Sequence, residues 1–246
     1  MSGHSKWHNI AAKKGKADAA RGRIFTKIGR ELAVAAKGNP NPATNSKLAD
    51  VIAKAKAANM PNDNIERSIK KAAGELGDKE YKELVYEGYG VAGSAVIINA
   101  LTDNINRTAG DIRSTMSKCG GQMGNTGCVS YMFDQKGYIV VERTLELDED
   151  TMMEYALDAG ADDVVVGEDV YEIFTSPADF SAVRTNLEAK NISFLQAEIS
   201  MIPQSKVSLE GDKLETFRKM LEKLEDLDDV QEVYHNVDLP EDEEEE

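Results

Sequence analysis

The chain contains little cysteine. Its 246 residues include two, Cys119 and Cys128, which lie nine positions apart. Neither belongs to a C-x-x-C unit, so the sequence gives little support to a zinc site or to thioredoxin-like redox chemistry. A secreted chain of this size with disulfides would usually carry more cysteines. We therefore expect a protein of the reducing cytoplasm.

Long apolar runs are also missing. No stretch approaches the roughly 18–20 apolar residues that a membrane helix needs, so we expect no membrane partner. The first ten residues lack the apolar core of a secretory signal. Hydrophobic residues nevertheless make up 41% of the chain, and its length suits two or three domains with real cores.

Recognisable catalytic machinery is absent from the sequence. None of the three histidines has a triad context, and neither a Walker motif nor H-E-x-x-H occurs. His4 and His8 have the spacing of zinc ligands on a helix, but no third ligand is apparent nearby. We expect a non-enzymatic protein with no cofactor and no metal site.

Charge is divided unequally along the chain. Residues 1–79 hold 16 Lys and Arg against 7 Asp and Glu, a net charge of +9. Residues 80–246 hold 13 against 37, a net charge of −24. A basic N-terminal part on an acidic body indicates that the basic part meets a polyanion. The acidic body is available to basic proteins.

The N-terminal part is predicted to form three short amphipathic helices, because apolar residues recur there at helical spacing. The three stripes are Ile24, Ile28 and Leu32; Leu48, Val51, Ile52 and Ala55; and Ile65 and Ile69. Asp63, with Glu66 three residues later, resembles a capping box at the start of the third helix.

The pattern changes after residue 80. Leu84–Tyr86 and Ser94–Leu101 are predicted strands, since they are apolar and rich in β-branched residues. Between them, Gly88, Gly90 and Gly93 have the G-x-G-x-x-G spacing of a dinucleotide-binding turn. Such a turn needs a helix to open within it, whereas a strand follows here. We interpret the glycines as a turn that joins two strands.

Further elements define the fold class. A helix is predicted over Thr108–Cys119 and a strand over Val129–Phe133. The elements that follow have the order β-α-β-β-α-β, which makes a complete ferredoxin-like unit: Tyr138–Glu142, Thr151–Ala159, Val164–Val166, Val170–Phe174, Pro177–Ala189 and Ser193–Ile199. A helix (Lys213–Leu224) and a strand (Val230–Tyr234) remain.

We therefore predict an α+β protein with an N-terminal three-helix domain followed by two α/β (ferredoxin-like) domains, one inserted within the other. The expected domains are 1–79, the discontinuous 80–134 with 205–246, and the inserted 135–204.

The basic N-terminal segment is the strongest electrostatic feature and the first candidate binding site. Its cations would contact phosphates, and Trp7 would stack on a base. The candidate residues are Lys6, Trp7, Lys13, Lys14, Lys16, Arg21, Arg23, Lys27 and Arg30. The alternative interpretation is a solvated basic end that binds nothing in particular.

A second candidate surface lies in the acidic body. Arg107 and Lys118 are eleven residues apart, which is three helical turns, so they share one face of the predicted helix. One interpretation is a second phosphate-contacting surface. The other is helix capping plus local salt bridges, which are common and weak.

Several motifs, in this order, resemble the YebC family over nearly the whole chain. They are GHSKW at 3–7, RGRIFTKIGREL at 21–32, NMPNDNIERSIKKA at 59–72, YEGYGVAG at 86–93, LTDNINRT at 101–108, KCGGQMGNTGCV at 118–129 and VQEVYHN at 230–236. Family members often have Pro-Gly at Val91-Ala92 and Ser at Cys128, two small departures in turn regions.

The resemblance implies the helical and α/β domains described above and a cytoplasmic DNA-binding regulator of transcription. The family also includes a mitochondrial translational activator, and bacterial members are linked to ribosomes stalled at proline runs. The alternative function is therefore a ribosome-associated translation factor that contacts rRNA or tRNA. A third possibility is a protein–protein adaptor whose basic end is incidental.

Overall fold

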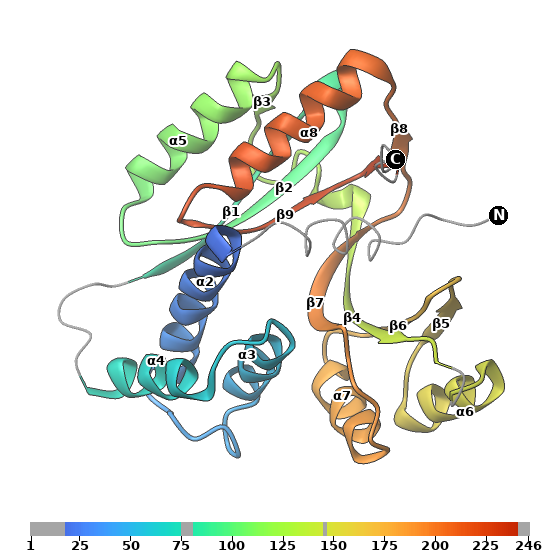
Figure 1. Ribbon diagram of the computed structural model, residues 1–246. Helices are drawn as coiled ribbons and strands as arrows, with labels where there is room; N and C mark the ends of the chain where they lie inside the picture. The colour runs from blue at the N-terminus through green and yellow to red at the C-terminus, as the bar shows by residue number, and fades with distance from the viewer. Residues whose placement is uncertain (1–17, 75–80, 145–146, 241–246) are drawn as a thin grey trace. The chain divides into compact units, whose positions relative to one another are not determined.

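The computed structural model describes residues 18–74, 81–144 and 147–240 (Figure 1). It is an α+β structure that divides into two compact units. Of the described residues, one unit holds 32–74, 135–144 and 147–201. The other holds 18–31, 81–134 and 202–240.

Three helices follow one another in the N-terminal part, as the apolar stripes predicted. They are α2 (Asp18–Ala36), α3 (Ser46–Ala57) and α4 (Asn62–Gly74). Ile28 and Leu32 are buried, whereas Ile24 at the start of the first stripe is 46% exposed. Asn45 caps α3, because its side chain accepts a hydrogen bond from the amide of Leu48.

The predicted capping box of the third helix is wrong. Helix α4 begins at Asn62, and the carbonyl of Pro61 accepts the amides of Asn64 and Ile65. Asp63 therefore lies inside the first turn, where its carboxylate is favourable for the helix dipole without being the cap.

One sheet contains four strands in the order β3-β1-β2-β9. These are β1 (Lys82–Tyr89), β2 (Ala95–Thr102), β3 (Gln122–Met123) and β9 (Val230–His235). Helices α5 (Ile105–Lys118) and α8 (Gly211–Glu225) pack on one face of this sheet, as Figure 1 shows. The core between them includes Val96 and Ile98 from β2, Ile112 and Met116 from α5, and Phe217, Met220, Leu221 and Leu224 from α8.

The second sheet has the order β5-β6-β4-β7. Its strands are β4 (Phe133–Glu142), β5 (Asp163–Val166), β6 (Val170–Thr175) and β7 (Gln196–Pro203), with helices α6 (Glu149–Ala159) and α7 (Phe180–Ala189). This order matches the predicted ferredoxin-like unit. One continuous stretch of chain supplies this sheet, whereas segments on both sides of it supply the other. The exact domain boundaries near residues 80, 135 and 205 stay a prediction.

Two short strands, β8 (Val207–Ser208) and β10 (Val237–Asp238), pair in parallel and have no counterpart in the predicted elements. The predicted strand over Val129–Phe133 is wrong. Ser130–Met132 forms the 3₁₀ turn η2, and β4 begins at Phe133. The cause is Glu87, whose carboxylate accepts the amides of Val129 and Ser130 that a strand would give to its neighbour.

The glycine motif joins two strands, as predicted. Gly88 lies in β1, and the 3₁₀ turn η1 (Val91–Gly93) leads directly into β2. The amide of Gly90 closes the turn by donating to the carbonyl of Ser94 at 2.7 Å. A Cβ at Gly88 would lie 2.4 Å from the carbonyl oxygen of Gln122, so this glycine allows β1 and β3 to approach.

Ala92 has a backbone conformation that is unfavourable for a residue with a side chain. Its φ of 55° lies in the left-handed region, which costs a residue with a Cβ about 1 kcal/mol, and its side chain is exposed. We expect Ala92→Gly to raise the free energy of unfolding by about 0.5 kcal/mol, measured by urea denaturation. The control Ala109→Gly, inside α5, should lower it by about 1 kcal/mol. A less stable Ala92→Gly variant would contradict the argument.

Candidate nucleic-acid interface

The structure describes only part of the predicted binding site. Lys6, Trp7, Lys13, Lys14 and Lys16 lie outside the described residues, as do His4 and His8. The backbone of Arg21 belongs to α2, but its side chain is not described. Of the predicted N-terminal cations, Arg23, Lys27 and Arg30 can be placed.

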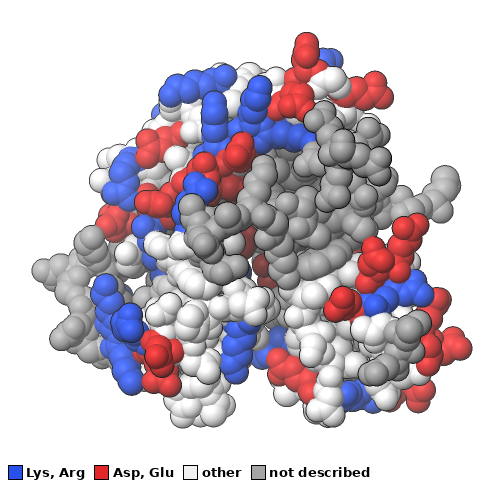
Figure 2. Space-filling view, viewed as in Figure 1, with Lys and Arg blue, Asp and Glu red and all other residues white. Residues whose placement is uncertain are grey.

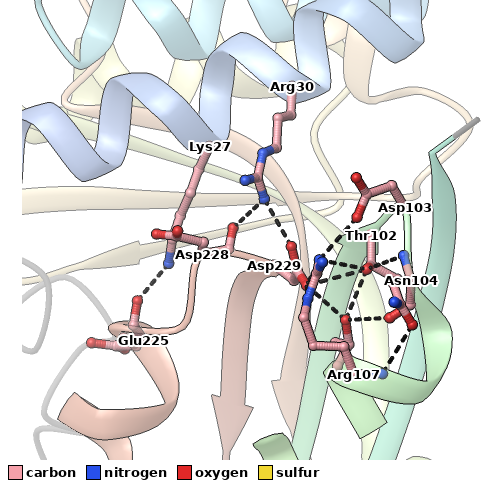
Figure 3. A network of polar contacts seen from close by, with 10 residues as sticks. Lys27, Arg30, Thr102, Asp103, Asn104, Arg107, Glu225, Asp228 and Asp229 are labelled. Atoms are coloured by element: carbon pink, nitrogen blue, oxygen red, sulfur yellow. Dashed lines mark hydrogen bonds and ion pairs between the residues drawn. The ribbon is translucent and has the colours of Figure 1, made fainter. Parts of the chain in front are cut away.

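These three cations contact an acidic turn between α8 and β9, formed by residues 225–229. Arg23 Nη1 lies 2.5 Å from Asp226 Oδ1. Lys27 Nζ donates to the carbonyl of Glu225 at 2.6 Å (Figure 3). Arg30 Nη1 donates to the carbonyl of Asp228 at 2.6 Å and to Asp229 Oδ1 at 3.1 Å. Helix α2 is thus held against the acidic turn by the cations predicted to bind phosphate.

Lys27 is the most enclosed of the three. Burial lowers the pKa of its ammonium, and the nearby carboxylates of Glu232, Glu225 and Asp226 offset only part of that effect. A lysine in such surroundings is less available to a polyanion than a lysine in open solvent. Arg23 keeps 46% of its side chain exposed, so it remains accessible.

Asp229 is the centre of a buried polar network (Figure 3). It is 8% exposed, and its Oδ2 accepts hydrogen bonds from Arg107 Nη2 at 2.6 Å, from the Thr108 hydroxyl at 2.7 Å and from the Thr102 hydroxyl at 3.1 Å. Burial raises the pKa of Asp229, but the hydrogen bonds from Arg107 and Thr108 outweigh it and hold the pKa below its ordinary value. The network joins α2, β2, α5 and the start of β9.

Arg107 makes the local salt bridges of the second interpretation, and its phosphate-binding role stays a prediction. It pairs with Asp103 at 2.9 Å as well as with Asp229, and hydrogen bonds to Asp229 raise its pKa. Asn104 caps the helix by accepting the amide of Arg107 at 3.1 Å, so α5 begins three residues before the predicted Thr108. Helix capping and ion pairing account for the polar segment that begins at Thr102.

Lys118 has different surroundings from Arg107, although both belong to α5. It is exposed at the C-terminal end of the helix and makes no ion pair among the residues that the structure describes. The two members of the predicted second surface thus differ: Arg107 is held in ion pairs, and Lys118 has none within the described part of the chain.

The sequence analysis did not identify other exposed cations of α5 and α8 as candidate binding residues. They are Arg113, Lys213, Lys219 and Lys223, and none forms an ion pair within the described part of the chain. Figure 2 shows Lys and Arg side chains gathered over α5 and α8, with Asp and Glu among them. The sequence pattern could have shown that these cations lie opposite the apolar stripe of each helix. It could not have shown that the two helices pack on one face of the same sheet.

The described residues contain no group of three or more His, Cys, Asp or Glu side chains arranged to hold a metal ion. No helix in the described part of the chain is long and apolar enough to cross a bilayer.

Comparison with known proteins supplies the family. Residues 5–75 match the family model of the TACO1/YebC protein N-terminal domain, and residues 81–237 match that of the TACO1/YebC second and third domain. A protein of Clostridium botulinum, strain Okra, named probable transcriptional regulatory protein, is 59% identical over 98% of both chains. A relative from Hathewaya histolytica with the same description is 58% identical, also over 98% of both chains.

A solved structure agrees with this assignment. The crystal structure of a conserved hypothetical protein from Aquifex aeolicus has a TM-score of 0.82 and 44% sequence identity. The match covers 94% of this chain and 96% of that one. Sequence motifs, family models and fold agree, and the chain belongs to the TACO1/YebC family.

Proposed function

We propose that this chain is a non-enzymatic, nucleic-acid-binding regulator of gene expression that acts on DNA to regulate transcription. The observation that carries the proposal is the charge division: a net +9 in residues 1–79 against −24 in the rest. A basic segment attached to an acidic body favours a polyanion as the partner of that segment. Relatives named as probable transcriptional regulatory proteins support the same function.

The described body offers further phosphate contacts. Lys118 and Arg113 on α5, with Lys213, Lys219 and Lys223 on α8, are exposed cations without ion pairs among the described residues. Contacts of this kind add affinity and set the position of the polymer, but they do not read its sequence. We therefore expect binding that is strong at low salt and tolerant of sequence.

The test is binding to a duplex DNA and to a structured RNA of equal length, measured by fluorescence anisotropy over a range of salt. Changing Lys13, Lys14, Lys16 and Arg21 to Gln should abolish binding near physiological salt. Because each phosphate contact contributes about 0.9 to the slope of log K against log salt, the slope should fall by about 3–4.

A matched control separates the site from the overall charge. Lys37, Arg67, Lys71 and Lys82 are exposed cations outside the proposed surfaces. Changing these four to Gln alters the net charge equally and should leave most of the affinity. Equal losses in the two variants, or no loss in the first, would contradict the proposal and favour an adaptor whose basic end is incidental.

The preferred polymer decides between the two forms of regulation. Tighter binding to duplex DNA supports a regulator of transcription. Tighter binding to RNA, with ribonuclease-sensitive migration beside ribosomes in a density gradient of cell lysate, would replace it with the translation alternative, which contacts rRNA or tRNA.

A further inference from the structure

The two glycine-rich segments of the sequence converge at one end of the β3-β1-β2-β9 sheet. Strand β3 pairs with β1 so that Gly88 lies opposite Met123 and Tyr89 opposite Gln122. A Cβ at Gly121 would lie 3.4 Å from the Cα of Gly90, so the two turns are in contact. We call residues 89–93 and 118–131 together the glycine end of the sheet.

Buried hydrogen bonds fix the conformation of the glycine end. Glu87 is 4% exposed, and its carboxylate accepts the amides of Gly127 at 2.7 Å, Val129 at 2.9 Å and Ser130 at 2.8 Å. The Tyr89 hydroxyl donates to the carbonyl of Cys128 at 2.9 Å. The surface is therefore pre-organised, which lowers the entropy lost when a ligand binds.

Two tyrosines are exposed on this surface. Tyr131 is 70% exposed and Tyr89 is 40% exposed, although both are large side chains that usually lose solvent on folding. They are near each other, because the Tyr89 hydroxyl contacts Cys128, three residues before Tyr131. Among the described residues, Tyr131 is the most exposed of the large hydrophobic side chains.

The charge of the glycine end differs from that of the rest of the acidic body. Its two segments contain no Asp or Glu, in a chain that carries 44 of them. Lys118 is exposed there, and Gln122, Asn125 and Thr126 add neutral polar groups. Lys118 and Gln122 are four residues apart, so their Cα atoms lie within about 14 Å of each other. A polyanion can therefore approach this surface without meeting a carboxylate within either segment.

We propose that the glycine end binds unpaired nucleotides of a nucleic acid, with Tyr131 and Tyr89 as stacking partners for bases and Lys118 as a phosphate contact. Stacking on a tyrosine face needs a base that is not covered by a neighbouring pair, so the ligand is single-stranded or a loop. The open backbone at Gly127, where a Cβ would meet no described atom within 4 Å, leaves room for the sugar-phosphate chain. This inference rests on the proposed function: the basic segment binds the polymer, and the glycine end adds contacts to an unpaired stretch of it.

The experiment compares Tyr131→Ala with Tyr131→Phe and the unchanged full-length chain. The probes are a labelled 12-nucleotide single strand of mixed sequence and a blunt duplex of the same sequence. Replacing an aromatic side chain on which a base stacks with alanine lowers the binding affinity. Tyr131→Ala should therefore weaken single-strand binding about 5- to 150-fold. Tyr131→Phe should keep most of the affinity, since it keeps the ring.

Two further readouts separate stacking from charge. Tyr131→Ala removes no charge, so the salt dependence of the remaining binding should be unchanged, whereas Lys118→Gln should lower the slope by about 0.7 for a single strand. Leu157→Ala, at a 63% exposed apolar residue of α6, is the control for loss of an exposed side chain and should change nothing.

Each outcome bears on one of the two proposals. If the unchanged chain binds and Tyr131→Ala binds the single strand equally well, the inference is overturned and the proposed function stands. The inference is likewise overturned, and the proposed function stands, if Tyr131→Ala weakens binding of the single strand and of the duplex to the same extent. If the unchanged chain binds neither probe at any salt, both fail.

Discussion

Replacing Asp229 with alanine is expected to lower the free energy of unfolding by about 2–4 kcal/mol. The substitution removes the acceptor of hydrogen bonds from Arg107, Thr102 and Thr108, and the two threonine hydroxyls are buried. A buried donor that loses its acceptor costs its desolvation energy, and Arg107 loses its shorter ion pair. Urea denaturation followed by circular dichroism measures the loss.

The adjacent residue provides a matched control. Asp228 is exposed, and its backbone carbonyl, not its side chain, accepts the hydrogen bond from Arg30. Asp228→Ala removes the same charge one position away and should change the stability by less than about 0.5 kcal/mol. Equal effects of the two substitutions would mean that charge reduction, and not the network around Asp229, determines the stability.

Replacing Glu87 with glutamine is expected to cost about 2–3 kcal/mol and to loosen the glycine end of the sheet. The carboxylate accepts three amides of residues 127–130, whereas the glutamine side chain offers one oxygen and an NH₂ group that faces donors. We expect faster amide hydrogen exchange at Gly127, Val129 and Ser130. Glu142→Gln, at an exposed position of β4, is the control and should have little effect.

The contribution of Glu87 also depends on pH. Burial raises its pKa, but the hydrogen bonds from the amides of Gly127, Val129 and Ser130 outweigh burial and hold it below the ordinary value of 4.5. A carboxyl with a lowered folded pKa stabilises the fold fully above its unfolded pKa and loses that contribution as the pH falls through the folded pKa. The stability difference between the unchanged chain and Glu87→Gln should therefore narrow below about pH 4.5. A difference that stays constant down to pH 2 would contradict the role of the charged carboxylate.

The carboxylates of Glu87 and Asp229 show what two of the sequence motifs do in the fold. Glu87 belongs to the stretch EGYGVAG, and its partners belong to the second glycine-rich segment about 40 residues later. Asp229 lies 122 residues from Arg107. In both cases a buried carboxylate in one segment accepts hydrogen bonds from donors in a distant segment. Each motif therefore contains only one of the two partners.

Contacts between distant segments also change the interpretation of the basic helix. In the sequence, Arg23, Lys27 and Arg30 are equal members of a basic helix. In the structure they meet the turn at 225–229, about 200 residues away in the chain, and Lys27 is largely enclosed by it. A nucleic acid that uses all three must compete with Asp226 for Arg23, with the carbonyl of Glu225 for Lys27, and with the acidic turn for Arg30. The free cations of α5 and α8 have no such competitor among the described residues.

The sequence by itself determined most of the elements, the fold class and the division of charge, because these depend on neighbouring residues. The stripe Leu48, Val51, Ile52 and Ala55 predicts α3, the run at 94–101 predicts β2, and the strand after Gly93 rules out the helix that a dinucleotide turn needs. Only the tertiary structure decided which charges are free, why Val129–Phe133 does not form a strand, and that two glycine-rich segments share one surface. Those outcomes depend on contacts between residues about 30 to 200 positions apart, and local periodicity carries no information about such contacts.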